Sequence, residues 1–308
     1  MGAIANRAET LLGTAVAATT PVAGGDICTA TRLRLSDGRS ALIKTRAHAP
    51  DDFFRIEAAG LQALRKAADT VDGAPAPEVL AVEADCLILS WIEPSRPSPE
   101  AAERFGRALA RTHRAGAAQF GALDGPGAAA GSATGSATGA AGQPANGYIG
   151  TLPLPNRPAP TWPEFYATRR VLPYLKLARD RGAVSADEAD AVEGVVRRLT
   201  ALAGPEEPPA LLHGDLWSGN VVWGADDRAW LVDPAAHGGH RETDLAMMAL
   251  FGLPQLQRVL DAYEQEHPLA EGWEDRVALH QLFPLLVHAA MFGGGYGARA
   301  AQAARSLL

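Results

Sequence analysis

The sequence predicts an α+β protein with two lobes, a small β-rich amino-terminal lobe and a larger helical carboxy-terminal lobe. Short segments with polar and apolar residues in alternation, a pattern typical of strands, occupy much of residues 1–92. Longer segments with helical spacing and capping residues occupy most of residues 93–308. Strands gathered at one end and helices at the other favour this class, with the domain boundary between residues 92 and 93.

The composition excludes several classes of protein. The 308 residues are 47% hydrophobic, which supports a sizeable core. With 28 basic and 35 acidic residues the net charge is −7, so the basic surplus of a nucleic-acid binder is missing. Cys28 and Cys86 form neither a disulfide framework nor a zinc spacing. Without a secretory signal or an apolar run of about 20 residues, we expect a cytoplasmic protein that binds no membrane.

The first lobe begins with an Ala-rich stretch, Met1–Thr19, that we expect to form a short helix. A strand broken by a glycine turn follows at residues 21–26, and alternation predicts another strand at Thr29–Leu35. Asp37-Gly38 is a strong hairpin signal, so residues 41–44 would form the returning strand.

The order of these strands strengthens two signals, a glycine turn and a strand lysine, that are each weak alone. Gly24-Gly25 lies between two strands, and the third strand carries Lys44. In kinases a glycine turn covers the nucleotide phosphates and a strand lysine reaches them. The ordinary alternatives are a structural turn and a solvated lysine. Asp51 and Asp52 would cap the next helix, and Glu57 lies early on it. Glu57 could pair with Lys44, or it could simply be an acidic residue that the helix dipole stabilises near the helix start.

The last predicted strand of this lobe, Cys86–Ile92, ends where kinases place the hinge between lobes. Backbone groups of Ser90, Trp91 and Ile92 would then bind adenine, although Trp91 could equally be a core residue. The first 92 residues are therefore expected to form a nucleotide-binding lobe.

Helix signals dominate the rest of the chain. Ser98-Pro99-Glu100 begins a helix, on which His113 is expected to be a buried scaffold residue, and Ser185 to Glu188 form a capping box. Residues 124–147 are a Gly/Ala-rich insertion that we expect to be a flexible loop. Helices are predicted at 242–253, 256–265 and 273–292, before a final Ala-rich helix.

The strongest motif lies between these helical regions. His213-Gly214-Asp215 followed by Asn220 matches the kinase catalytic loop H-x-D-x-x-x-x-N. Asp215 would take the proton of the acceptor hydroxyl, and Asn220 would bind magnesium. A hairpin over 221–232 would return the chain so that Asp233 supplies a carboxylate to the metal. Polar caps and a solvated aspartate explain these pieces only separately, so the expected fold is protein-kinase-like.

Longer stretches strongly resemble the fructosamine kinase (ketosamine-3-kinase) family. The resemblance covers nearly the whole chain. Residues 213–220, 233–235, 239–247 and 250–252 carry it, and residues 24–25, 57–61, 146–156 and 292–296 fit it too. Trp217 and the Glu-x-Asp-Leu-Ala-Met run distinguish these stretches from aminoglycoside and choline kinases. Within that run, Glu242 and Asp244 are expected to be scaffold residues that support the catalytic loop. The 124–147 insertion is longer and simpler than the family pattern, and Cys28 lies farther from the glycines.

The resemblance implies ATP-dependent phosphorylation of the 3-hydroxyl of a ketosamine, whose unstable 3-phosphate then decomposes and frees the amine in a deglycation repair. It implies ATP and Mg²⁺ as cofactors, with Asp215 as base, Asn220 and Asp233 as metal ligands, and Lys44 with Glu57 as the phosphate pair. The substrate could be small or protein-bound, and derived from ribose or fructose. We expect a monomer or weak homodimer.

Three questions stay open from the sequence. Trp217 could offer its face to the sugar and His288 could donate to a hydroxyl, or His288 could be a packed helix histidine. Cys28 could be a redox-sensitive thiol or a small strand residue. The alternative functions are a kinase for another hydroxylated metabolite or an aminoglycoside, and a non-catalytic nucleotide-binding protein.

Overall fold

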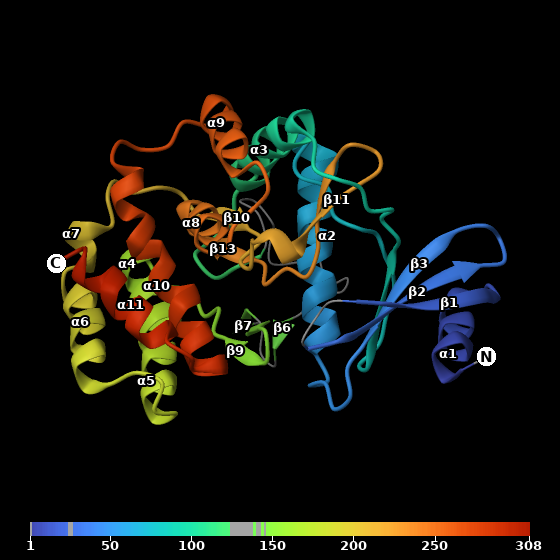
Figure 1. The fold of residues 1–308 in the computed structure, drawn as a ribbon, viewed down its shortest axis with the longest axis horizontal. Helices are drawn as coiled ribbons and strands as arrows, with labels where there is room; N and C mark the ends of the chain where they lie inside the picture. Colours follow the sequence, from blue (N-terminus) through green and yellow to red (C-terminus); the bar gives the residue numbers. More distant parts are fainter. Residues whose placement is uncertain (1, 24–26, 124–137, 140–142, 145) are drawn as a thin grey trace.

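A computed structural model describes residues 2–23, 27–123, 138–139, 143–144 and 146–308. The first part of the chain forms a five-stranded antiparallel sheet, and most of the remainder is helical (Figure 1). The predicted α+β class is therefore confirmed. The predicted boundary between residues 92 and 93 falls between the last strand of this sheet and the next helix, and it stays a prediction.

The sheet has the strand order β1-β2-β3-β5-β4. Its strands are β1 (Val16–Val22), β2 (Thr29–Leu35), β3 (Ser40–Thr45), β4 (Val79–Val82) and β5 (Cys86–Ser90). The turn predicted at Asp37-Gly38 joins β2 to β3, where Arg34 pairs with Ser40 and Ala30 pairs with Lys44. This register fixes the place of Lys44 near the end of β3.

The two faces of the sheet bury different helices because successive strand side chains point to opposite sides. On β5, Cys86 and Ile88 pack in the core that contains α1 (Ala3–Leu12). Leu87 and Leu89 pack on the other side, in the core that contains α2 (Phe53–Val71). In Figure 1, α2 stands between the sheet and the helical part.

Two expectations for this region are wrong. The helix expected over Met1–Thr19 ends at Leu12, because Gly13 adopts a left-handed backbone with φ 63°. The β-branched residues that follow favour a strand instead, and β1 begins at Val16 and pairs with β2. Asp52 occupies the capping position of α2, but its side chain makes no capping hydrogen bond.

The helical part follows the predicted order of elements. Its longer helices are α3 (Pro99–Arg114), α5 (Leu172–Asp180), α6 (Ala186–Arg197), α8 (Glu242–Phe251), α9 (Leu256–Glu266), α10 (Trp273–Phe292) and α11 (Tyr296–Arg305). Shorter helical turns are α4 (Trp162–Phe165), a π-helical turn at Tyr166–Val171, α7 (Leu199–Leu202) and a 3₁₀ turn at Ser218–Asn220. The predicted caps form, since Ser98 accepts from the N–H of Ala101 and Ser185 and Glu188 form a capping box.

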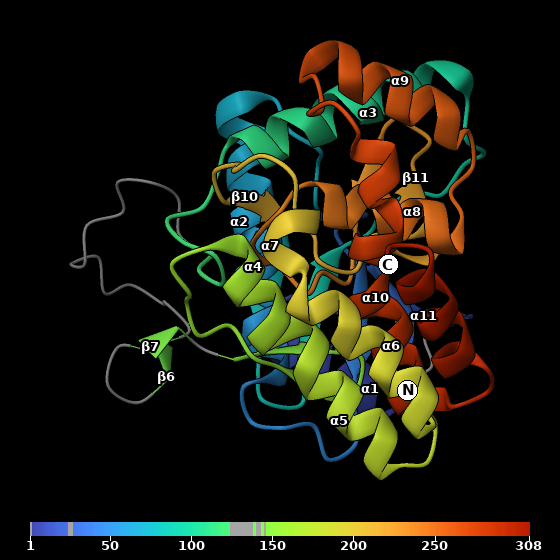
Figure 2. The ribbon, with the colours of Figure 1, turned by 90° about the vertical axis from the view of Figure 1, so that its left-hand side faces the viewer.

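Short strand pairs connect these helices. They are β6 (Thr138–Gly139) with β7 (Gln143–Pro144), β8 (Gly147–Ile149) with β9 (Leu152–Leu154), β10 (Ala210–Leu212) with β13 (His237–Gly239), and β11 (Val221–Trp223) with β12 (Ala229–Leu231). The hairpin predicted over 221–232 is β11–β12. Most of the predicted insertion at 124–147 lies outside the described residues. Its described parts include β6 and β7 (Figure 2).

Two apolar cores support the helical part. One is shared by α5, α6, α10 and α11, and the other joins α2 and β5 to α3, α8, α9 and the β11–β12 hairpin. The second core therefore links the sheet to the helices around the predicted catalytic loop. Among the described residues, no helix combines the length and apolar character needed to cross a membrane.

Candidate active site

Lys44 joins two carboxylates that lie far from it in the sequence. Its Nζ is 2.6 Å from Glu57 Oε1 and 2.8 Å from Asp233 Oδ1. Lys44 and Glu57 are buried, whereas Asp233 is partly exposed. Burial alone would lower the pKa of Lys44, but the charges of Glu57 and Asp233 outweigh it and raise that pKa. Lys44 is therefore a fixed cation, and the predicted lysine–glutamate pair is formed.

The His213–Asn220 loop begins where β10 ends. Leu212 of β10 pairs with His237 of β13, which brings the loop beside the chain that follows β12. Gly214 has φ 82°, and a Cβ on it would lie 2.2 Å from the carbonyl oxygen of Ala235. Only glycine fits this close approach. The middle residue of His-Gly-Asp is therefore fixed by packing against the segment after Asp233.

Asp244 on α8 holds the backbone of this loop. Its carboxylate accepts hydrogen bonds from the N–H groups of His213 at 2.7 Å and Gly214 at 2.9 Å. His113 Nε2 donates to the same carboxylate at 3.2 Å, so His113 Nδ1 accepts from the hydroxyl of Tyr263 at 2.8 Å. The expected scaffold roles of His113 and Asp244 agree with this geometry, in which both side chains are fully buried.

Asp215 and Asn220 face each other across the loop. Asn220 Nδ2 donates to both the backbone oxygen and Oδ2 of Asp215, at 2.8 and 2.9 Å. Burial of the Asp215 carboxyl raises its pKa to about 7. The hydrogen bond from Asn220 lowers this pKa, whereas the negative charges of Asp233 and Asp244 raise it further. Protein surrounds most of this carboxyl, but part of Asp215 stays accessible. An accessible carboxylate with a near-neutral pKa has the properties of a general base.

The same amide hydrogen bonds orient Asn220. Because its Nδ2 is engaged with Asp215, its amide oxygen lies on the opposite side of the group. Backbone bonds tie the two predicted metal ligands together, since the N–H of Val232, next to Asp233, donates to the carbonyl of Asn220 at 3.0 Å. His213 Nε2 also donates to the carbonyl of Val232 at 2.9 Å. The oxygens of Asn220 and Asp233 are the hard donors that Mg²⁺ prefers.

The predicted hinge leaves the sheet at the end of β5. The N–H of Ser90 donates to Glu78 and that of Trp91 donates to Ser40, which fixes the path of the chain. The Trp91 ring lies under the guanidinium of Arg32 at 4.5 Å, and its Nε1 donates to Glu93. Trp91 is thus packed against β2 rather than in the core, while Ile92 is half-buried.

The glycine turn and Cys28 complete the nucleotide half of the prediction. Gly24 and Gly25 lie outside the described residues, so their role stays a prediction. Cys28 is partly buried, and burial raises the pKa of its thiol despite the nearby charge of Lys44. A raised pKa lowers the thiolate fraction, which disfavours the redox-sensitive thiol, and Cys28 lies just before β2 rather than in a strand.

Trp217 and His288 meet through a residue that the sequence analysis missed. The ring of Phe251, at the end of α8, is 6.4 Å from Trp217 and 4.4 Å from His288. His288 also packs against Phe292 and Tyr296, and 55% of Phe292 is exposed. These five residues, which we call the aromatic patch, extend outward from the catalytic loop. Signals for Phe251 were present in Leu250-Phe251-Gly252, but the contact depends on tertiary packing.

The hydrogen bond of His288 changes its expected role. Its Nδ1 donates to the carbonyl of Pro284 at 2.8 Å, and burial lowers the pKa of the ring. The neutral ring therefore presents Nε2 as an acceptor, in contrast to the donor expected from the sequence.

Comparisons with known proteins now identify the family. A model of the fructosamine kinase family matches residues 1–125 and 132–308. The chain belongs to the fructosamine kinase family. A probable ketoamine kinase of Thermus thermophilus is 35% identical over 280 residues, covering 90% of this chain and 88% of that protein. Another, from Enterococcus faecium, is 31% identical and covers 92% of each chain.

Solved structures agree with this placement. A candidate fructosamine-3-kinase from Thermobifida fusca is 46% identical, with a TM-score of 0.87 and coverage of 99% of this chain and 98% of that one. An ADP-bound aminoglycoside phosphotransferase matches the fold alone, at 13% identity, a TM-score of 0.61 and full coverage of both chains. The expected protein-kinase-like fold is therefore confirmed.

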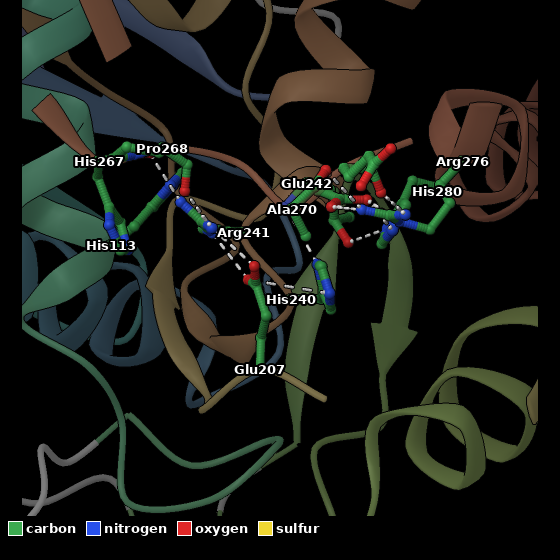
Figure 3. Close-up of polar contacts among 12 residues, drawn as sticks. His113, Glu207, His240, Arg241, Glu242, His267, Pro268, Ala270, Arg276 and His280 are labelled. Carbon is green, nitrogen blue, oxygen red and sulfur yellow. Dashed lines mark hydrogen bonds and ion pairs between the residues drawn. The ribbon is translucent and has the colours of Figure 1, made fainter. Parts of the chain in front are cut away.

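In this family member a buried polar network anchors α8, the helix that carries Asp244 (Figure 3). Both carboxylate oxygens of Glu242 bind Arg276, at 2.6 and 3.0 Å, and Glu242 also lies 3.2 Å from His280 Nε2. Glu242 therefore holds α8 to α10 and does not touch the catalytic loop, which the sequence analysis had expected it to support. Arg241 similarly binds Glu207 at 2.6 and 2.7 Å.

The types of residue in this network also suit a metal. Among the residues the structure describes, His240, Glu242 and His280 have ligand atoms within 4.8 Å of one another. A metal ion there would have to share the Glu242 carboxylate with the guanidinium of Arg276. The His280 ring also stacks on Trp162 at 4.7 Å. We therefore assign the cluster a structural role.

The neutral histidines around this network predict how stability depends on pH. Burial lowers the pKa of His237 and His240 to about 3, whereas unfolded histidine titrates near 6.5. Their contribution is thus fully present above pH about 6.5 and is lost progressively as the pH falls toward 3. Each contributes at most about 1.4 kcal/mol per pH unit. Urea unfolding between pH 7.5 and 5 should show this decline.

His240→Gln supplies the control. Unfolding of the variant should take up as much as one proton fewer, so its unfolding free energy should depend less steeply on pH over the same range. Equal slopes for the wild type and the variant would show that His240 does not stay neutral in the folded protein.

Proposed function

We propose that this protein transfers the γ-phosphoryl group of ATP to the 3-hydroxyl of a ketosamine, a sugar joined to an amine by glycation. The product 3-phosphate would decompose and free the amine. The observation that supports this most is the set of contacts from Lys44 through Asp233 to the loop of Asp215 and Asn220, in a chain of this family. Phosphoryl transfer depends mainly on positioning and charge neutralisation, which these groups could supply.

Each group has a definite role in this proposal. Asp215 orients the acceptor hydroxyl and takes its proton, which its near-neutral pKa and partial exposure support. Lys44 binds the nucleotide phosphates and Glu57 holds Lys44 in place. The N–H groups of Ser90 and Trp91 already donate to Glu78 and Ser40, so adenine binds to the carbonyl groups of these two residues and to the backbone of Ile92. The Gly24-Gly25 turn covers the phosphates.

Magnesium fits the residues present. The Asn220 amide oxygen lies away from Asp215, and the partly exposed Asp233 carboxylate already binds a cation, Lys44. These two oxygens would hold the metal, which neutralises phosphate charge when it is bound. The side chain of Lys44 meanwhile keeps Asp233 directed toward the nucleotide lobe.

The aromatic patch is our candidate for the sugar-amine subsite. Trp217 lies two residues after the proposed base and is 37% exposed, so its face can cover a sugar ring. The Nε2 of His288 would accept a hydrogen bond from a substrate hydroxyl or ammonium group. Phe251 holds the two side chains in one surface.

Replacement of Trp217 or His288 by alanine should raise the KM for ketosamine about 10-fold, or about 1.4 kcal/mol, because the contacts stabilise bound substrate. The KM for ATP should stay unchanged, and Trp217→Phe should retain most of the affinity. Steady-state kinetics with each substrate varied separately will measure this. Unchanged ketosamine KM values in both alanine variants would remove these residues from the subsite.

A coupled assay of ADP release tests the proposed function itself. We expect turnover with ribulosamine or fructosamine substrates and a product phosphorylated at the 3-position by NMR. Turnover of an aminoglycoside, with none for either ketosamine, would contradict the proposal.

A further inference from the structure

The β8–β9 hairpin contacts both halves of the proposed active site. Tyr148 of β8 donates a hydrogen bond from its hydroxyl to Asp52 Oδ1 at 2.7 Å, and its ring lies 5.3 Å from that of Phe53. Gly150, in the turn, has φ 61°, and a Cβ there would lie 3.4 Å from Ile27 and 2.6 Å from Met291. The hairpin thus lies between the first turn of α2, the chain before β2, and the end of α10.

The carboxylate of Asp52 accepts a hydrogen bond from Tyr148 and none from a backbone N–H of α2. Asp52 precedes Phe53, the first residue of α2, and aspartate at this position usually accepts from a backbone N–H of the first turn. Here the carboxylate makes no such bond, and the first turn contains no acidic residue. The start of α2 is therefore held by a side chain from the hairpin rather than by its own cap.

The position of this helix start matters for Lys44. Glu57 lies four residues after Phe53, about one turn along α2, and its carboxylate is 2.6 Å from Lys44 Nζ. Arg46, which directly follows β3 and lies two residues beyond Lys44, places its guanidinium over the ring of Phe53 at 4.5 Å. Tyr148, Phe53 and Arg46 therefore form a continuous contact from the hairpin to the strand that carries Lys44.

We propose that Tyr148 is a positioning residue of the nucleotide site, which fixes α2 through Asp52 and Phe53 and thereby aligns the Glu57–Lys44 ion pair. This inference rests on the proposed kinase function, because the aligned pair is the one that would bind the ATP phosphates. Without the Tyr148 hydroxyl, the first turn of α2 loses its side-chain anchor. Glu57 then restrains Lys44 less well, whereas the aromatic patch on the catalytic loop, α8, α10 and α11 is not disturbed.

The test compares Tyr148→Phe, Asp52→Ala and Asp52→Asn in the full chain. The first two lose the hydrogen bond, while the amide oxygen of Asp52→Asn can still accept it. We expect Tyr148→Phe and Asp52→Ala each to lower kcat/KM for ATP about 5- to 20-fold and to raise the Kd of the non-hydrolysable analogue AMP-PNP. Asp52→Asn should retain at least about half of the wild-type value, and the double variant Tyr148→Phe/Asp52→Ala should be no worse than the worse single variant.

A tyrosine that binds the other strand of the hairpin provides the control. Tyr174 on α5 donates to the carbonyl of Pro153 on β9 at 2.6 Å, far along the chain from α2. Tyr174→Phe loses a comparable hydrogen bond and should leave kcat/KM for ATP within about twofold. The KM for ketosamine should stay constant throughout.

The outcomes separate a positioning role from a structural one. If Tyr148→Phe and Asp52→Ala lower the melting temperature but leave kcat, kcat/KM for ATP and AMP-PNP affinity unchanged, the inference is wrong. If the wild type turns over no ketosamine, the proposed function is wrong. The Kd values of AMP-PNP for the wild type and the variants still test this inference. Equal AMP-PNP affinity in the wild type and both variants would then overturn it.

Discussion

Asp215→Asn is expected to lower kcat for ketosamine phosphorylation by about 10²- to 10⁴-fold, the usual range for loss of a general base. The carboxylate lies beside Asn220, and its raised pKa matches a proton acceptor that works near neutral pH. An amide oxygen at residue 215 can still accept the hydrogen bond from Asn220 Nδ2, so the loop should keep its shape. The loss should therefore appear in kcat and not in folding.

Two further measurements make this result specific. The melting temperature and the Kd of AMP-PNP should stay close to those of the wild type, because Asp215 contacts neither the hinge nor Lys44 among the bonds formed here. A variant that keeps more than about a tenth of the wild-type kcat would show that Asp215 is not the base.

Asp233→Asn should have the second largest effect, with kcat lowered by about 10²-fold or more. The substitution removes the charge that would bind Mg²⁺ and that now lies 2.8 Å from Lys44 Nζ. Asp233 has φ 55°, a left-handed conformation that asparagine tolerates well, so the backbone is not strained. A titration of MgCl₂ against activity should therefore show a midpoint moved to higher concentration.

Asp227→Asn is the matched control for this variant. Asp227 also has positive φ, at 61°, but lies at the exposed tip of the β11–β12 hairpin with Arg104 and Ser98. An exposed ion pair contributes about 0–1 kcal/mol, so activity and the magnesium midpoint should not change. If Asp233→Asn behaved like Asp227→Asn, the proposed metal role of Asp233 would be wrong.

The predictions that succeeded rest on local rules. The loop from His213 to Asn220 is eight residues long, and its spacing alone places Asp215 and Asn220 within hydrogen-bonding reach. The Asp37-Gly38 turn fixes the pairing of β2 with β3 and so the place of Lys44. The capping signals at Ser98 and Ser185 likewise depend only on residues within one helical turn.

Local rules fail at two places. Asp52 is a residue type that commonly caps helices, but its carboxylate accepts from the hydroxyl of Tyr148, 96 residues away, and from no backbone N–H of α2. The three residues His237 to Gly239 have little strand propensity, and they form β13 only because β10 provides a partner. Both outcomes depend on groups that are distant in the sequence.

The sequence by itself determined the family, the order of elements and the residue types of the site, because these follow from short-range spacing and motif. Only the tertiary structure decided how the site is assembled. Lys44 and Asp233 are 189 residues apart and His113 and Asp244 are 131 apart, yet each pair is in direct contact. Such contacts form because burial leaves a charged or polar group no solvent to bind, so it must find a partner elsewhere in the chain.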